Sequence, residues 1–309
     1  MPNWVTVRVK AKNPQILSDK LLSAYTQEQI DNEENFADNG EELEKFVDFN
    51  KLIPTPSDLN IQSGAGSYYN EDHYFDFQKD RVEQQKGIIT PMLERNYKEG
   101  MTQADFLEKA MPFAIIYKER FETVYGTNIS DEKMMKEDLT NILKGFYNFK
   151  TYGNVDWYDF HNAKWGTKWN AQTTYVDEEL GYVEFQTAWS CPFELLEELA
   201  KYTDIAVSYA DEDTGSNYGV YTITNGVKED VISCSRYNEL TDAEKIRAIT
   251  TATVITMGEI YDINEDIFGH YEDGEFNEYF HMPKEEVIEI AQESAREVQE
   301  IVGNLGLLY

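Results

Sequence analysis

The sequence predicts an α+β protein built on an antiparallel sheet, and three patterns favour that class. After Trp4, apolar and polar residues alternate as far as Lys10, which is the period-two pattern of a half-buried strand. A later block reads as strand, strand, helix, strand, strand, over residues 173–176, 182–188, 193–202, 205–209 and 218–224. Long helical patterns lie on either side of that block. Together these features predict an antiparallel sheet that includes the N-terminal strand, with helices on one face.

The predicted helices fall into two blocks, with one short helix near the start over residues 14–25. The first block covers residues 73–96, 102–125 and 130–149; Thr102 and Asp105 predict a capping box, Ser130 an N-cap, and Pro112 is a candidate kink. The second block covers residues 241–260 and 283–305. The expected domains are a discontinuous core of residues 1–60 and 151–230, a helical insertion over 70–150, and a C-terminal helical region over 231–309.

Charge is the most informative feature of the composition. The chain has 27 Lys and Arg against 58 Asp and Glu, a formal net charge of −31. Such a surface repels nucleic acid, which needs a groove lined by Lys and Arg, and it attracts a basic partner in a salt-dependent way. The alternative is that the acidity serves solubility alone.

Acidic clusters are the predicted partner-binding residues. Carboxylates spaced along a rigid surface can imitate the phosphates of a duplex, so a nucleic-acid-binding groove on another protein could accept them. The candidates are Glu33, Glu34, Asp38, Glu41, Glu42, Asp177, Glu178, Glu179, Asp211, Glu212, Asp213, Asp262, Asp266, Glu272 and Asp273. A solvated face is the alternative for each cluster.

Four of the five tryptophans lie close together in the sequence and predict either a pocket or a core. The pocket candidates are Trp157, His161, Trp165, Trp169 and Trp189. Trp165 and Trp169 are four residues apart, so core packing over the sheet is the competing interpretation. Asp159 lies beside His161 and could assist it as a base, but no nucleophile is evident.

No metal, cofactor or catalytic site is predicted. The histidines and the two cysteines, Cys191 and Cys234, lack ligand spacing. The acidic run from Asp262 to Asp273 resembles a calcium loop but has Ile267 where glycine is required. No segment is apolar enough to span a membrane and no signal sequence begins the chain, so a cytoplasmic location is expected.

Three pieces of the chain resemble a known family: the opening MPNWVTVRV, the piece FVDFNKLIPTP over residues 46–56, and WGTKWNA followed by FQTAWSCP within residues 165–192. They resemble the YubB-type ferredoxin-like family of plasmids, integrative elements and phages. The resemblance implies a ferredoxin-like α+β domain whose first strand is N-terminal. It brings no catalytic residues to this chain, and it does not extend to the helical insertion or the C-terminal helices.

Three functions follow as expectations. The first is a non-enzymatic, acidic interaction protein of a phage or mobile element that inhibits a basic, nucleic-acid-binding host defence protein, as a nucleic-acid mimic. The second is an enzyme or small-molecule-binding protein with a pocket at the Trp157–Trp189 cluster. The third is a structural accessory protein that self-associates through the apolar stripe of the last helix, which comprises Val287, Ile290, Ala291, Ala295, Val298 and Ile301.

Overall fold

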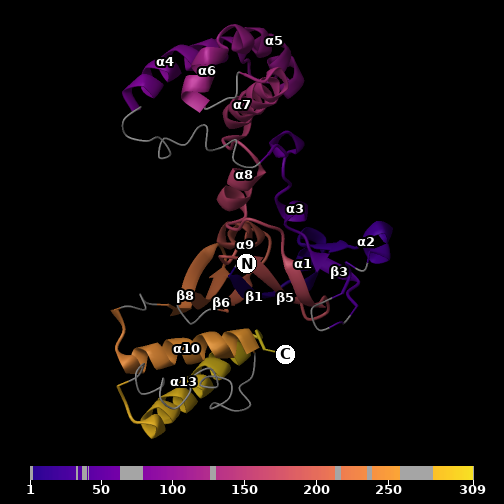
Figure 1. Cartoon of the computed structure of the whole chain (residues 1–309). Coiled ribbons are helices and arrows are strands. Elements are labelled where there is room, and N and C mark those ends of the chain that lie inside the picture. Colours follow the sequence, from indigo (N-terminus) through magenta and orange to yellow (C-terminus); the bar gives the residue numbers. More distant parts are fainter. Residues whose placement is uncertain are drawn as a thin grey trace. The chain divides into compact units, whose positions relative to one another are not determined.

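The structure is a computed structural model, and it divides into two compact units (Figure 1). It describes residues 3–32, 34–36, 40, 42–62, 79–125, 130–212, 217–234, 239–257 and 281–308, with the backbone alone for 79–86. One unit comprises Met1–Pro54 and Lys164–Tyr309, and the other comprises Thr55–Ala163. We call them the sheet unit and the helical unit.

The sheet unit contains a six-stranded antiparallel sheet in the order β4-β5-β1-β6-β7-β8. Its strands are β1 (Trp4–Ala11), β4 (Gln172–Asp177), β5 (Tyr182–Ala188), β6 (Ile205–Asp211), β7 (Tyr218–Thr224) and β8 (Val227–Ser233). The N-terminal strand lies in the middle, paired with β5 on one side and β6 on the other. The predicted α+β class and the antiparallel sheet with its N-terminal strand are confirmed.

One face of the sheet is covered by short helices that follow β1, the small strand β3 and β5 in the chain. They are α1 (Pro14–Lys20), α3 (Phe49–Leu52) and α9 (Phe193–Leu199), and beside them lie α2 (Gln27–Asp31) and the small pair β2 (Leu22–Ala24) and β3 (Lys45–Val47). Val5, Val7 and Val9 of β1 alternate into this core and are fully buried. The alternation seen in the sequence therefore faces these helices.

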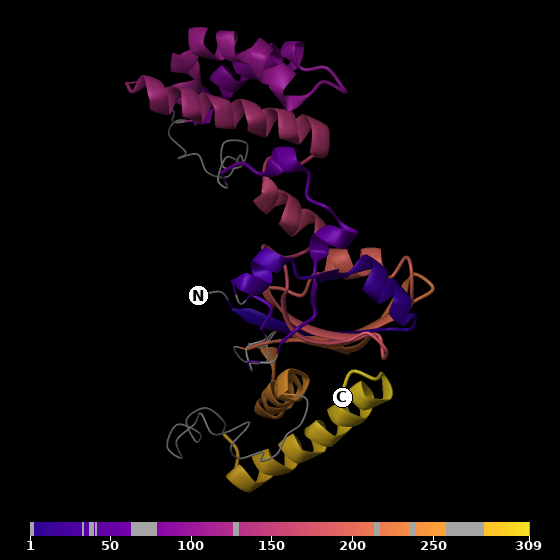
Figure 2. The ribbon, with the colours of Figure 1, turned by 90° about the vertical axis from the view of Figure 1, so that its right-hand side faces the viewer.

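The opposite face is covered by two long helices, α10 (Asp242–Met257) and α13 (Lys284–Asn304). Ala210 and Val220 of the sheet share a buried cluster with Val254 of α10 and Val298 of α13. Figure 2 shows the sheet edge-on, with α10 and α13 on one side and the short helices on the other. The expectation of helices on one face is wrong, because the C-terminal helices bury the second face.

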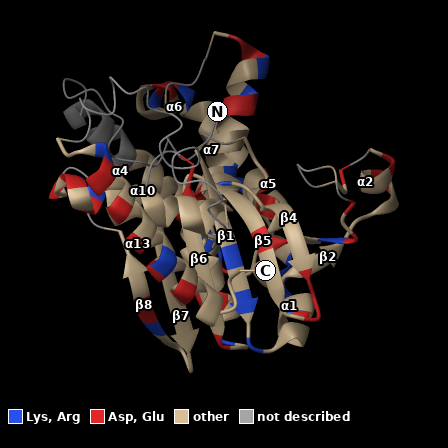
Figure 3. Cartoon of the chain, turned by 90° about the horizontal axis from the view of Figure 1, so that it is seen from below, with Lys and Arg blue, Asp and Glu red and all other residues tan. Residues whose placement is uncertain are grey.

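A buried arginine links β1 to the end of α10. The Arg8 side chain is 5% exposed and forms an ion pair of 2.6 Å with Glu184, the residue directly opposite it on the neighbouring strand β5. Its guanidinium also donates to the carbonyl oxygens of Ile255 and, at 2.9 Å, Thr256 in the last turn of α10. Basic residues on β1 lie beside acid on β5 in Figure 3. A cation at this end of a helix satisfies carbonyls that have no partner within the helix.

The helical unit begins with a short turn, η1 (Ser57–Leu59), and contains five helices within the described residues. They are α4 (Lys79–Asn96), α5 (Gln103–Ile116), α6 (Lys118–Tyr125), α7 (Glu132–Tyr152) and α8 (Trp157–Lys164). Phe106 and Phe146 stack at 5.7 Å in its core. Asn148 of α7 is fully buried, donates to the carbonyls of Asp58 and Val155, and accepts from Gln103.

Several predicted element boundaries differ from the structure. The helix expected over 14–25 ends at Lys20, and β2 follows it. The helix expected over 102–125 is interrupted at Tyr117, and Pro112, the candidate kink, lies inside α5. Asp131, and not Ser130, caps α7 by accepting from two backbone amides. The Thr102–Asp105 capping box is confirmed.

Candidate interaction surfaces

The motif pieces that carry the family resemblance contact one another in the sheet unit. Asn170 accepts from the amide of Phe49 at 2.9 Å and donates to Asp48 at 3.1 Å. The buried indole of Trp165 donates to the carbonyl of Ile53 at 3.0 Å. The motifs therefore hold α3 against the loop before β4, which is a structural role.

The turn after β5 directs Trp189 into solvent. Thr187 donates to the carbonyl of Ser190 at 2.7 Å and closes the turn. Trp189 has a φ of 72° and is 57% exposed. A positive φ is a strained conformation for a bulky residue. Its amide donates to the carbonyl of Asn3 at 2.8 Å, which places it beside the start of β1.

The predicted tryptophan pocket is divided by the architecture. Trp157 belongs to the helical unit, whereas Trp165, Trp169 and Trp189 belong to the sheet unit. Trp165 is 1% exposed and is a core residue. Trp169 is 39% exposed, and its ring lies 6.3 Å from that of Trp4. Only Trp169 and Trp189 of the four therefore present a large surface in the sheet unit.

His161 lies on α8 of the helical unit, beside a hydroxyl group and an aromatic ring. Its Nε2 lies 3.0 Å from the hydroxyl of Thr55, and its ring lies 5.3 Å from that of Trp157. Burial and the neighbouring Asp156 raise the pKa of Asp159 above its usual value. Asp156 accepts from the amide of Asp159, as the residue at the start of a helix does. Asp156 and Asp159 both lie at the N-terminal end of α8, so a structural role at the start of the helix accounts for them.

Several of the predicted partner-binding acids have partners within the chain. Glu178 pairs with Lys45 at 2.6 Å and accepts from Ser18. Asp177 accepts from the amide of Leu180 at 2.8 Å in the β4–β5 turn. Glu212 accepts from the amide of Trp4 at 3.0 Å, which ties the start of β1 to the end of β6. These carboxylates contribute to the fold as well as to the surface charge.

The other predicted acids divide into exposed residues and residues outside the described ranges. Glu34, Glu42 and Glu179 are exposed, and Asp211 is buried beside Asn3. Outside the described residues lie Glu33, Asp38, Glu41, Asp213, Asp262, Asp266, Glu272 and Asp273, together with the rest of the calcium-like run. Within the described ranges, no group of three or more His, Cys, Asp or Glu side chains could hold a metal ion.

An acidic surface that the sequence analysis missed lies along α13. Its members are exposed and recur every three or four residues: Glu286, Glu289, Glu293, Glu297 and Glu300. At 1.5 Å per residue they form a stripe about 21 Å long on one face of the helix. We call it the glutamate stripe. The signal was present in the sequence, because these positions alternate with the apolar stripe of the same helix.

That apolar stripe is occupied within the chain. Val287 and Ala291 are fully buried, and Ala295 and Val298 are nearly so, in clusters that include residues of α10. Self-association through α13 would therefore need another of its surfaces, such as the glutamate stripe, where like charges repel.

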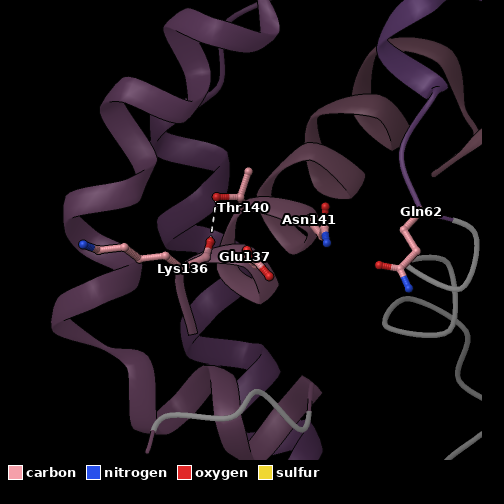
Figure 4. Close-up of a pocket in the computed structure, with 5 residues that line it drawn as sticks. All are labelled: Gln62, Lys136, Glu137, Thr140 and Asn141. Atoms are coloured by element: carbon pink, nitrogen blue, oxygen red, sulfur yellow. Dashed lines mark hydrogen bonds between the residues drawn. The ribbon is translucent and has the colours of Figure 1, made fainter. Parts of the chain in front are cut away.

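A polar hollow of about 410 Å³ lies in the helical unit (Figure 4). Lys136, Glu137, Thr140 and Asn141 of α7 line it together with Gln62. Thr140 donates to the carbonyl of Lys136 at 2.7 Å, within its own helix. Of the described residues that line the hollow, two are ionisable, Lys136 and Glu137.

The cysteines are not an active pair. Cys191 is fully buried at the start of α9, and burial raises the pKa of its thiol well above the usual range. A thiol in that state is a poor nucleophile. Cys234 is half-buried and also unpaired with another cysteine.

The fold defines an α+β protein with a ferredoxin-like domain. A family model described as the ferredoxin-like domain in Api92-like protein matches residues 164–253, from the last residue of α8 into α10. The chain matches no curated protein and no solved structure. Among the described helices, none combines the length and the apolar composition needed to cross a membrane.

Proposed function

We propose that this chain is a non-enzymatic interaction protein whose acidic surface binds a basic, nucleic-acid-binding protein. The observation that carries the proposal is the glutamate stripe of α13, which presents five exposed carboxylates on one helix face. A rigid line of negative charge is the feature that a phosphate-binding groove accepts.

The charge of the stripe is only partly balanced by neighbouring cations. Arg247 of α10 lies 2.9 Å from Glu293 and 3.9 Å from Glu297. Glu286, Glu289 and Glu300 have no ion pair within the described residues. The net charge of −31 supports the same proposal, because it accelerates encounter with a basic partner and penalises encounter with nucleic acid.

The family resemblance suggests a narrower version of the proposal. In a phage or mobile element, the basic partner would be a host defence factor that handles nucleic acid, and the chain would inhibit it by competing for its groove. The narrower version adds the setting and the partner class, and it rests on the resemblance to the YubB-type family.

The proposal is tested by capture and then by direct binding. The chain is used to capture proteins from host cells at about 50 mM and about 500 mM salt, and a protein recovered at low salt is purified. Its affinity for the chain is then measured across salt concentrations and in competition with duplex DNA. We expect a steep loss of affinity with salt and mutual exclusion with DNA.

A matched pair of variants assigns the binding to the stripe. Glu286, Glu289 and Glu300 are changed to Gln in one variant, and Glu108, Glu119 and Glu122, which are exposed in the helical unit, are changed to Gln in the other. Both variants alter the net charge equally, so a general charge effect would weaken both. If only the α13 variant loses binding to the captured protein, the proposal is supported. If binding does not depend on salt and neither variant weakens it, the proposal is contradicted.

A further inference from the structure

We propose that the end of the sheet formed by Trp4, Trp169, Trp189 and Glu212 is a docking surface for an arginine-bearing segment of a partner protein. We call it the tryptophan edge. The inference rests on the proposed function, because it assumes a basic protein partner, and it adds a second contact surface and the chemistry of its ligand.

Three adjacent strands bring these residues together. Trp189 follows the last residue of β5, Trp4 opens β1, and Glu212 follows the last residue of β6. The amide of Trp189 donates to Asn3, and Glu212 and Trp4 exchange two hydrogen bonds of 3.0 and 3.1 Å. Since neighbouring strands lie about 4.8 Å apart, the backbones at Trp189 and Glu212 are separated by about 10 Å.

The chemistry of the tryptophan edge suits a guanidinium group. The face of an indole attracts a cation, and a carboxylate binds guanidinium through charge-assisted hydrogen bonds. Lys168 already places its ammonium 4.4 Å from the centre of the Trp169 ring. The Trp189 ring and the exposed Glu212 carboxylate are the remaining members that an incoming arginine could contact.

The backbone at Trp189 supports a role in recognition. A φ of 72° is adopted freely by glycine, whereas a tryptophan there is strained, and more than half of the surface of this residue is exposed. The exposed ring therefore contributes little to the core, and the backbone conformation at this position is unfavourable for tryptophan. A contact with a partner accounts for a large aromatic residue at a position that favours glycine.

The inference is tested with a defined probe, a short peptide of four arginines spaced by glycines, against the full-length chain. The indole N–H signals of the ¹⁵N-labelled chain are followed during titration, and the Trp189 signal is assigned from Trp189→Gly. We expect saturable movement of that signal, weaker binding at higher salt, and a loss of affinity of about fivefold in Trp189→Gly. Glu212→Gln is expected to weaken binding to a smaller extent. Trp157→Phe, in the helical unit, is the control and should bind as the unaltered chain does.

Each other outcome overturns the inference. Peptide affinity that is unchanged in Trp189→Gly shows that the arginines bind elsewhere, and equal binding of a glutamate peptide shows that the ligand chemistry is wrong. A solution mass that falls from dimer to monomer in Trp189→Gly identifies a second copy of the chain as the occupant. If the α13 variant loses the captured partner while Trp189→Gly retains it, the proposed function stands and the tryptophan edge does not take part. If both variants retain the partner, both proposals fail.

Discussion

Arg8 and Glu184 form an ion pair of 2.6 Å between the neighbouring strands β1 and β5, with side chains 5% and 13% exposed. The same guanidinium closes the last turn of α10, so one residue joins two strands and a helix. Thr174 donates to the other oxygen of Glu184 at 2.9 Å and completes the network. The second face of the sheet therefore depends on a polar connection as well as on apolar contact.

Replacement of Arg8 by Met is expected to destabilise the sheet unit by about 3–5 kcal/mol, because it leaves a buried carboxylate without its cation. The free energy of unfolding from urea titration measures the effect. The double variant with Glu184→Leu should recover part of the loss, since it removes the unpaired charge. If the loss of unfolding free energy in the double variant equals the sum of the losses in the two single variants, Arg8 and Glu184 are not energetically coupled.

Replacement of Trp189 separates backbone strain from the side chain. Trp189→Gly is expected to be more stable than Trp189→Ala by about 1 kcal/mol, because only glycine adopts a φ of 72° without strain. Thermal unfolding of the two variants gives the comparison. An alanine variant at least as stable as the glycine variant would show that the turn is not strained.

Asn148 is expected to be essential to the helical unit. Asn148→Leu keeps the volume but leaves the carbonyls of Asp58 and Val155 and the amide of Gln103 without this partner. The expected cost is about 3 kcal/mol, from buried polar groups that lose hydrogen bonds. Hydrogen exchange of the α5 and α7 amides reports it. Asn162→Ala, an exposed position on α8, is the control and should leave exchange unchanged.

Glu178 is expected to make the stability of the sheet unit sensitive to acid. Hydrogen bonds from Lys45 and Ser18 lower the pKa of Glu178 below its usual value of 4.5. A lowered pKa in the folded state gives a stabilisation that is present above pH 4.5 and is lost as the pH falls through the folded pKa. Urea midpoints of the unaltered chain and Glu178→Gln should therefore converge as the pH is lowered from 6 to 3. A difference that stays constant over this range would contradict the assignment.

The sheet was largely predictable because one face of β1 is uniformly apolar and a tight turn follows β7, although helices cover both faces of the sheet. Val5, Val7 and Val9 alternate with polar residues, and the Asn225-Gly226 turn adopts the two positive φ angles of a tight hairpin. The strand after that turn, β8, was not predicted. Its residues from Val227 to Val231 are all exposed, so no alternation marks it. The strand β8 lies at the edge of the sheet and forms by pairing with β7, so its own sequence carries little sign of a strand.

The interaction surfaces were harder to predict than the fold. The cluster of tryptophans was visible, but its division between two units depends on contacts between residues far apart in the sequence, such as Trp165 with Ile53. The exposure of Trp189 is associated with a turn in which this residue has a positive φ. A tryptophan in the sequence does not predict a positive φ. The glutamate stripe could have been found from helical periodicity alone, because its spacing is local.

The central position of β1 has a consequence for synthesis on the ribosome. Its two neighbours begin at Tyr182 and Ile205, so the valine-rich first strand emerges long before either can pair with it. The helical unit, encoded in between, is made largely of helices, whose backbone hydrogen bonds are local and form quickly. An unpaired apolar strand is prone to join another chain, so nascent copies of this protein should depend on chaperones until β6 has been made.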